Sequence, residues 1–195
     1  MGNVILDMAM SLDGIIAGPN DEYVGLHDWF FDPVGRNREI VDESLATTGA
    51  LIMGRRTYDM AAEQDAFVDN PYNVPHVVLT HTVPKTVVKG STPFIFVTDG
   101  IESALDQARA AAGDKHVVIG GGANIARQYL QSGLLDAIQI ALVPIVVGKG
   151  IRLFDKIDAS PIELETTRVI DAPGVTHFQF RVVKDNKRKS SAHEQ

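Results

Sequence analysis

The chain has no cysteine among its 195 residues, so disulfides, thiolate catalysis and cysteine-ligated zinc or iron–sulfur centres are excluded. It also lacks an excess of positive charge, because 18 Lys and Arg residues stand against 25 Asp and Glu residues and leave a net charge of −7. A chain of this charge does not have the basic surface of a general nucleic-acid binder. We therefore expect no nucleic acid among its partners.

Long apolar runs are missing as well. No stretch reaches the ~18 consecutive apolar residues of a membrane span. The apolar stretch near the N-terminus follows no basic residues and is interrupted by Asp7 and Asp13, unlike a signal peptide. These features predict no membrane partner and a cytoplasmic location.

Metal-binding patterns are also scarce. The six histidines include no pair at positions i and i+4 and no tight cluster with carboxylates, so we expect no metal site. These histidines are His27, His76, His81, His116, His177 and His193.

The composition that remains is that of an ordinary globular protein, with 45 % apolar and 22 % charged residues. The length fits one domain, since domains run to about 100–200 residues. We predict a single domain over residues 1–184. Residues 185–195 have no apolar periodicity and are expected to form a flexible polar tail.

Short apolar, β-branched runs alternate with helical patterns, and this alternation predicts an α/β three-layer sandwich. Runs of this kind are typical of strands buried on both faces of a mostly parallel sheet. The expected strands are Val4–Met10, Ala50–Met53, His76–Thr80, Phe94–Thr98, His116–Ile119, Ala137–Val143 and His177–Val183. The expected helices are Asn37–Thr47, Ile101–Ala112 and Asn124–Ser132.

The C-terminal part of the chain has a different pattern. The runs Ile162–Ile170 and Val175–Val183 flank the turn sequence Asp171–Gly174. They predict an antiparallel hairpin, and hence an antiparallel C-terminal edge on the central sheet.

The strand expected at His116–Ile119 leads into three glycines and then a helix. Gly120–Gly122 allow backbone amides to approach a ligand closely, and the N-terminus of the following helix is an anion site. The spacing differs from the dinucleotide fingerprint, which needs Gly where Ile125 stands. The motif indicates either a ligand-binding loop or a tight turn without a ligand.

Two further strands end in polar residues. In Gly54–Thr57, the guanidinium groups of Arg55 and Arg56 could clamp a phosphate at the start of a helix, or form an exposed pair without a ligand. The segment Leu79–His81 ends the next strand in a hydroxyl and an imidazole. Because ligands bind at the carboxyl ends of parallel strands, the three motifs together predict a phosphate-bearing ligand.

Four motifs follow one another along the chain: Ser11-Leu12-Asp13-Gly14, Met53-Gly54-Arg55-Arg56-Thr57-Tyr58, Leu79-Thr80-His81 and Ile119-Gly120-Gly121-Gly122. In this order they resemble the dihydrofolate-reductase-like fold, and within it a stand-alone form of the reductase domain of the bifunctional riboflavin-biosynthesis deaminase-reductase. The resemblance extends over about residues 3–184. It implies NADPH binding and hydride transfer.

The resemblance also implies roles for individual residues. Ala9 and Ile16 would flank the nicotinamide, and Arg55 would hold the 2′-phosphate, which favours NADPH over NADH. The pyrophosphate would lie between Gly54–Thr57 and Gly121–Ile125, and the adenosine ribose would lie on the segment that ends in His81. The full set of expected cofactor-binding residues is Ala9, Ile16, Gly54, Arg55, Arg56, Thr57, Leu79, Thr80, His81, Ile119, Gly120, Gly121, Gly122, Ala123, Asn124 and Ile125.

The substrate side departs from dihydrofolate reductase. Arg38 stands where that family has its folate-binding carboxylate, and a shifted register would bring Glu39 or Asp42 there instead. Trp29 lies in the same region. Lys149, between two glycines, would hold a substrate phosphate or belong to a plain loop. We take Trp29, Asp42 and Lys149 as candidate substrate-binding residues.

Two carboxylates are candidate catalytic residues. Asp13 is the leading candidate for the proton donor, because it follows the first strand where the loop over the nicotinamide would begin. Its alternative role is that of an Asp-Gly turn residue. Glu39 is the second candidate.

The sequence thus predicts an NADPH-dependent oxidoreductase acting on a small heterocyclic or sugar-phosphate-bearing substrate, similar to 5-amino-6-(5-phosphoribosylamino)uracil reductase. Dihydrofolate reduction and a non-catalytic NADPH- or nucleotide-binding module are the alternatives. The zinc deaminase activity of the bifunctional enzyme is not expected of this chain, because its cysteine ligands are missing. The apolar stretch Ile138–Val147 is expected to provide surface for a homodimer.

Overall fold

The computed structural model describes residues 2–85, 88–158 and 161–184, and the predicted tail lies outside them. The strands are β1 (Val4–Ser11), β2 (Ile15–Ala17), β3 (Thr48–Gly54), β4 (His76–Leu79), β5 (Phe94–Val97), β6 (His116–Ile119), β7 (Ala137–Val143), β8 (Ile151–Arg152), β9 (Leu164–Ala172) and β10 (Val175–Val182). The helices are α1 (Asp28–Phe31), α2 (Arg36–Thr47), α3 (Arg55–Glu63), α4 (Ile101–Ala112) and α5 (Ala123–Gln131), with a short 3₁₀ helix, η1 (Pro19–Asp21).

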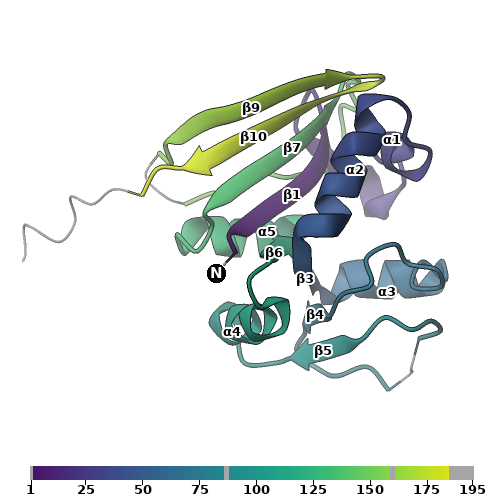
Figure 1. Ribbon diagram of the computed structural model, residues 1–195, viewed down its shortest axis with the longest axis vertical. Helices are drawn as coiled ribbons and strands as arrows, with labels where there is room; N and C mark the ends of the chain where they lie inside the picture. The colour runs from purple at the N-terminus through teal and green to yellow at the C-terminus, as the bar shows by residue number, and fades with distance from the viewer. Residues whose placement is uncertain (1, 86–87, 159–160, 185–195) are drawn as a thin grey trace, which may run out of the picture.

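Eight of the strands form one sheet in the order β5-β4-β3-β6-β1-β7-β10-β9. In Figure 1 this sheet extends from β9 and β10 at the top to β5 at the bottom, with α2 in front of the central strands. β10 is antiparallel to both of its neighbours, whereas the other strand pairs of this sheet are parallel. The predicted α/β sandwich, with a mostly parallel sheet and an antiparallel C-terminal edge, is therefore confirmed.

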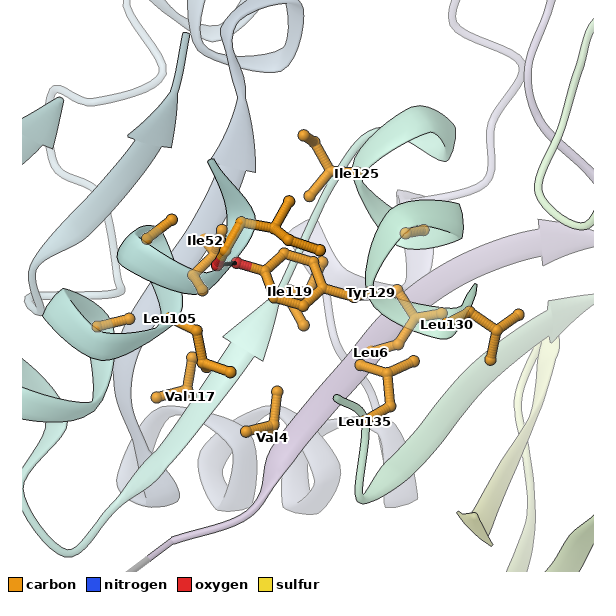
Figure 2. Close-up of a cluster of buried hydrophobic side chains, with 14 of the residues drawn as sticks. Val4, Leu6, Ile52, Leu105, Val117, Ile119, Ile125, Tyr129, Leu130 and Leu135 are labelled. Atoms are coloured by element: carbon orange, nitrogen blue, oxygen red, sulfur yellow. Dashed lines mark hydrogen bonds between the residues drawn. The ribbon is translucent and has the colours of Figure 1, made fainter. Parts of the chain in front are cut away.

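The main hydrophobic core lies between the sheet and helices α4 and α5. Leu6, Ile52 and Ile119 point to this side from the sheet, and Leu105 meets them from α4. Tyr129 of α5 is fully buried at the centre of the cluster, where its hydroxyl donates a hydrogen bond to the carbonyl of Ile101 (2.8 Å; Figure 2). This core holds the two helices in place, and one of them begins at the glycine motif.

Helices α2 and α3 cover the opposite face. Tyr58 of α3 packs against Met53 and Val78 of the sheet, while Val41 of α2 is buried nearer the middle of the sheet. The alternation along β1 and β3 explains this division, because successive side chains of a strand point to opposite faces.

The C-terminal hairpin has a tighter turn than expected. Ala172 pairs with Val175, so Pro173 and Gly174 alone form the loop. Gly174 has a φ of +76°, which suits the third position of a turn with Pro before it. The first strand of the hairpin therefore lies two residues nearer the turn than the apolar run indicated, while the second begins at Val175 as expected.

The apolar stretch Ile138–Val147 does not provide the continuous surface that was expected of it. Residues Ala137–Val143 form β7, which lies inside the sheet between β1 and β10. Only the end of the stretch, at Ile145 and Val146, has exposed large apolar side chains. Strand pairing buries most of the stretch, so the prediction that it forms a dimer surface is wrong for all but its end.

Among the described helices, none has the length and apolar content needed to cross a membrane.

Candidate functional site

Three of the sequence motifs meet where β3, β4 and β6 end. Gly54 pairs with Leu79 in neighbouring parallel strands, and Ile52 pairs with Ile119 on the other side of β3. The N–H of Gly54 donates to the carbonyl of Gly121 (3.0 Å), and the N–H of Gly120 donates to the carbonyl of Ile52 (3.1 Å). These bonds join the arginine motif and the glycine motif directly.

A cavity of about 1390 Å³ opens at this end of the sheet. It is large enough for a dinucleotide, since small-molecule sites commonly measure about 300–1,000 Å³. The expected cofactor residues that line it are Ile16, Gly54, Arg55, Arg56, Thr57, Leu79, Thr80, His81, Gly120, Gly121, Gly122, Ala123, Asn124 and Ile125.

Two expected cofactor residues lie elsewhere. Ile119 is fully buried in the core beneath the cavity. Ala9 lines a second, smaller cavity that is described below.

The N-termini of α3 and α5 both face the larger cavity. Their N-cap residues are Gly54 and Gly122, and neither helix has a capping side chain among the described residues. The first amides of a helix without such a cap remain available to a ligand, and the helix dipole favours an anion there. Two such ends beside one cavity suit a ligand with two linked phosphates.

Glycine allows these two helix ends to come close together. A Cβ on Gly121, whose φ is +151°, would lie 3.0 Å from Cγ2 of Thr57. A Cβ on Gly54 would lie 2.9 Å from Cγ1 of Ile125. Side chains at these positions would push α3 and α5 apart, so the glycines set the width of the anion site.

Both arginines of the motif have acidic partners. Nε of Arg55 donates to Oδ1 of Asp59 (2.7 Å), and its Nη1 donates to the carbonyl of Thr82 (2.8 Å) in the loop after β4. Arg56 forms an ion pair with Asp21 of η1. The guanidinium groups are thus held at the cavity wall, and their charge is partly balanced.

A second cavity of about 290 Å³ lies on the α2 face of the sheet. It shares Met8, His27 and Gly120 with the larger cavity, so the two are neighbours. Trp29, an expected substrate-binding residue, lines it together with Ala9. The first strand therefore contributes residues to both cavities.

His177, which lines the smaller cavity, belongs to a hydrogen-bond network. The amide nitrogen of Asn37 donates to the carbonyl of Pro173 (2.9 Å), so its oxygen faces Nε2 of His177 at 3.0 Å. Burial, with Arg168 nearby, lowers the pKa of His177 to about 4. The imidazole is therefore neutral at pH 7 and donates from Nε2 to the amide oxygen of Asn37. Its ring packs edge-on against Trp29, with 4.7 Å between the ring centroids.

Asp7, a residue that the sequence arguments missed, lines the smaller cavity from the middle of β1. Its side chain is half-buried, and desolvation raises its pKa to about 6. The carboxyl group forms no hydrogen bond or ion pair with any residue that the structure describes. A single acidic residue within the apolar run Val4–Met10 was the signal that could have identified it.

Asp13, the expected proton donor, lines neither cavity. Its carboxylate accepts hydrogen bonds from the hydroxyl of Ser11 (2.7 Å) and from the backbone N–H groups of Val147 (3.1 Å) and Gly148 (2.8 Å). The bond from Ser11, followed by the two backbone bonds, lowers its pKa to about 2. An aspartate held ionised in this way favours the turn-residue role over proton donation.

Three other expected residues are not brought to either cavity. Glu39 and Asp42 are exposed on α2, because that helix turns Ile40, Val41 and Ser44 toward the sheet. Lys149 is exposed in the loop before β8 and also lines neither cavity.

Within the described ranges, no three His, Asp or Glu side chains gather in a way that could hold a metal ion.

Structures of other proteins share this fold. A protein from Shewanella sp. PV-4 described as a riboflavin biosynthesis protein is 24 % identical, with a TM-score of 0.72 over 93 % of this chain and 99 % of that one. A dihydrofolate reductase from Enterococcus faecalis, complexed with NADP(H), is 17 % identical, with a TM-score of 0.60 over 94 % and 98 %.

A diaminohydroxyphosphoribosylaminopyrimidine deaminase/5-amino-6-(5-phosphoribosylamino)uracil reductase from Thermotoga maritima is 16 % identical, with a TM-score of 0.71 over 93 % of this chain. This chain spans only 57 % of the length of that protein. At these identities the likenesses show the fold.

The model of the RibD C-terminal domain family matches residues 3–176. That range begins just before β1 and includes the glycine and arginine motifs and all the strands up to the start of β10. Because the match covers most of the sequence, the chain belongs to the RibD C-terminal domain family.

Proposed function

We propose that this protein is an NADPH-dependent reductase that transfers a hydride to a small heterocyclic substrate, in a reaction similar to that of 5-amino-6-(5-phosphoribosylamino)uracil reductase. The observation that carries the proposal is the meeting of two uncapped helix N-termini and two arginines on one cavity of about 1390 Å³. Membership of the RibD C-terminal domain family supports a reductase of this class.

The residues of the larger cavity fit this cofactor. The first turns of α3 and α5 would bind the pyrophosphate through backbone amides, with the hydroxyl of Thr57 between them. Arg55, held beside Thr80 by its bonds to Asp59 and Thr82, would face the 2′-phosphate. When bound, NADPH supplies the hydride.

The substrate would occupy the smaller cavity. Hydride transfer requires the two reacting rings to be adjacent, and the cavities meet at Met8, His27 and Gly120. Trp29 would exclude water from one side of this junction. Asp13 would act outside the reaction, as the anchor that holds Val147 and Gly148 beside β1.

A thermal shift with NADPH and with NADH tests the proposal. A ligand at 100 times its Kd stabilises the folded state by about 2.7 kcal/mol. For a domain of this size that corresponds to a rise in Tm of about 5–10 °C. We expect NADPH to give this rise at a lower concentration than NADH, and no shift with either nucleotide would contradict the assignment of the cofactor.

We also propose that the protein is a homodimer. The exposed apolar side chains of Leu12 and Val146 support it, because they lie together where the N–H of Leu12 bonds to the carbonyl of Ile145. Light scattering in solution should give twice the chain mass of 21.2 kDa, and a particle of the monomer mass would refute the dimer.

A further inference from the structure

A row of polar side chains crosses the floor of the smaller cavity. Asp7 of β1 pairs in register with Gln139 of β7, and Gln139 pairs with Gln179 of β10. Residues paired in register point to the same face of a sheet, and neighbouring strands lie about 4.8 Å apart. All three residues line the cavity, so they form a continuous polar strip among apolar neighbours.

The polar groups of this strip have no partners within the described protein. Neither the carboxyl group of Asp7 nor the side-chain amides of Gln139 and Gln179 form a hydrogen bond with another described residue. Other polar groups at the cavity do have partners, for example Glu43, which pairs with Arg168 at 2.8 Å. The three side chains are partly exposed, so their unpartnered donors and acceptors are available to a ligand in the cavity.

The charge of the cavity selects among ligands. Among its described lining residues there is no Lys or Arg. Arg168 pairs in register with Gln179 and its charge is felt at His177, but Arg168 does not line the cavity and its guanidinium is engaged in an ion pair with Glu43. An ionised phosphate would therefore meet the carboxylate of Asp7 without a compensating cation, whereas a cation or a pair of N–H donors would be attracted to it.

The walls of the cavity select the shape of the ligand. Three aromatic rings line the cavity in sequence: Trp29 meets Phe30 edge-on, with ring centroids 5.9 Å apart, and Phe30 stacks on Tyr72 at 6.2 Å. Aromatic rings beside a volume of about 290 Å³ suit one planar ring.

We propose that Asp7, Gln139 and Gln179 are the specificity-determining residues of the substrate pocket, and that they select a planar, nitrogen-rich ring with an amidine-like edge that donates two hydrogen bonds. The substrate places no phosphate in this cavity. The inference rests on the proposed function, because it takes the smaller cavity as the place of the reacting ring.

Three probes of similar size and shape test this selection: benzamidine is a cation with two parallel donors, benzamide is neutral, and benzoate is an anion. Their affinities are measured by calorimetry without cofactor, and the emission of Trp29, the only tryptophan of the chain, reports binding at the cavity. We expect benzamidine to bind most tightly, benzoate most weakly, and Asp7→Asn to weaken benzamidine binding about tenfold or more.

Asp106→Asn is the matched control, because it removes one negative charge from the exposed face of α4, outside both cavities. It should bind benzamidine as the parent protein does. Equal affinities for the three probes, a preference for benzoate, no binding of benzamidine, or unchanged binding in Asp7→Asn would overturn the proposal. The selectivity of the parent protein is informative even if a variant does not fold.

The outcome is separate from that of the cofactor assignment. If the reductase proposal fails but the strip exists, NADPH gives no thermal shift while benzamidine still binds selectively. If the strip fails but the reductase proposal holds, NADPH shifts the Tm and the probes show no selectivity.

Discussion

The two cavities of this protein are neighbours, but they are built in different ways. The larger one is formed by backbone groups at strand ends, where Gly54 and Gly121 let two helix N-termini approach. The smaller one is formed by side chains from the middle of strands, with Asp7 at its floor. Binding by backbone amides depends on where glycine is tolerated, whereas binding by side chains depends on which strands lie side by side.

Substituting a glycine of the larger cavity gives the largest expected effect. In Gly121→Ala the new Cβ would lie 3.0 Å from Thr57 and impose a side chain on a φ of +151°. Because this would displace α5 from α3, several backbone hydrogen bonds to phosphate would be lost, at about 1.5–3 kcal/mol each. We expect the Kd for NADPH, measured by calorimetry, to rise about 100-fold or more.

Gly133→Ala is the control for backbone strain alone. Gly133 also has a positive φ, of +70°, but a Cβ there would meet open space, and the residue lines neither cavity. This variant should lose about 1–2 kcal/mol of stability and keep its affinity for NADPH. Unchanged NADPH affinity in Gly121→Ala would show that the larger cavity does not bind through backbone groups that glycine brings together, and would contradict the comparison with the smaller cavity.

Replacing Asp7, the carboxylate of the smaller cavity, by Asn should have an intermediate effect, which appears in the free energy of unfolding. Burial raises the pKa of Asp7 from 3.8 to about 6, so the folded state binds this proton more tightly than the unfolded state does. The stability linked to Asp7 is therefore fully present below about pH 4 and is lost as the pH rises through about 6. Two pKa units correspond to at most about 3 kcal/mol.

Urea unfolding of Asp7→Asn and of the parent protein at about pH 4 and pH 7.5 tests this. The variant should be more stable by up to about 3 kcal/mol at the higher pH, with a smaller difference at the lower pH. Comparing variant with parent at each pH cancels the titration of the other groups at the cavity, namely His27, Glu43, Tyr72, His116 and His177. A variant that is less stable at pH 7.5 would show that the carboxylate is structural.

Arg55→Ala should give the smallest effect. A single charge-assisted contact to the 2′-phosphate is worth about 1.5 kcal/mol, so NADPH affinity should fall about tenfold while NADH affinity stays within about twofold. Asp59→Asn is the counterpart, since it removes the acid that holds Nε of Arg55 and should not weaken NADPH binding. An equal loss for both nucleotides in Arg55→Ala would assign the arginine to the pyrophosphate instead.

The structure confirms those parts of the fold that depend on local patterns. Helix α4 has the bounds that its alanine-rich pattern and Gly113 predicted, and β6 and β7 also match. Bounds differ where pairing between strands moved the end of an element, as in β9, which continues to Ala172 in the hairpin that closes at Pro173 and Gly174. Local sequence specifies the type of an element, whereas its length also depends on its neighbours.

The residues of the candidate site also fall into those that local sequence patterns located and those that depend on distant contacts. The expected cofactor segments at Gly54–Thr57 and Gly121–Ile125 share one cavity, because glycine patterns mark backbone sites and the carboxyl ends of parallel strands meet at one edge. The carboxylates were harder to place. Asp13 is held by the backbone of Val147 and Gly148, which are far away in the sequence, and no local pattern indicates such a contact.

By itself, the sequence determined the alternation of strands and helices and the three strand ends that form the larger cavity, because apolar periodicity and glycine act locally. Only the tertiary structure decided that Asp7, Gln139 and Gln179 form one strip, since they come from three different strands and only the pairing of those strands in register brings them together. Their register follows from the packing of the whole sheet. Burial of the Asp7 carboxylate costs stability, which a bound ligand would offset.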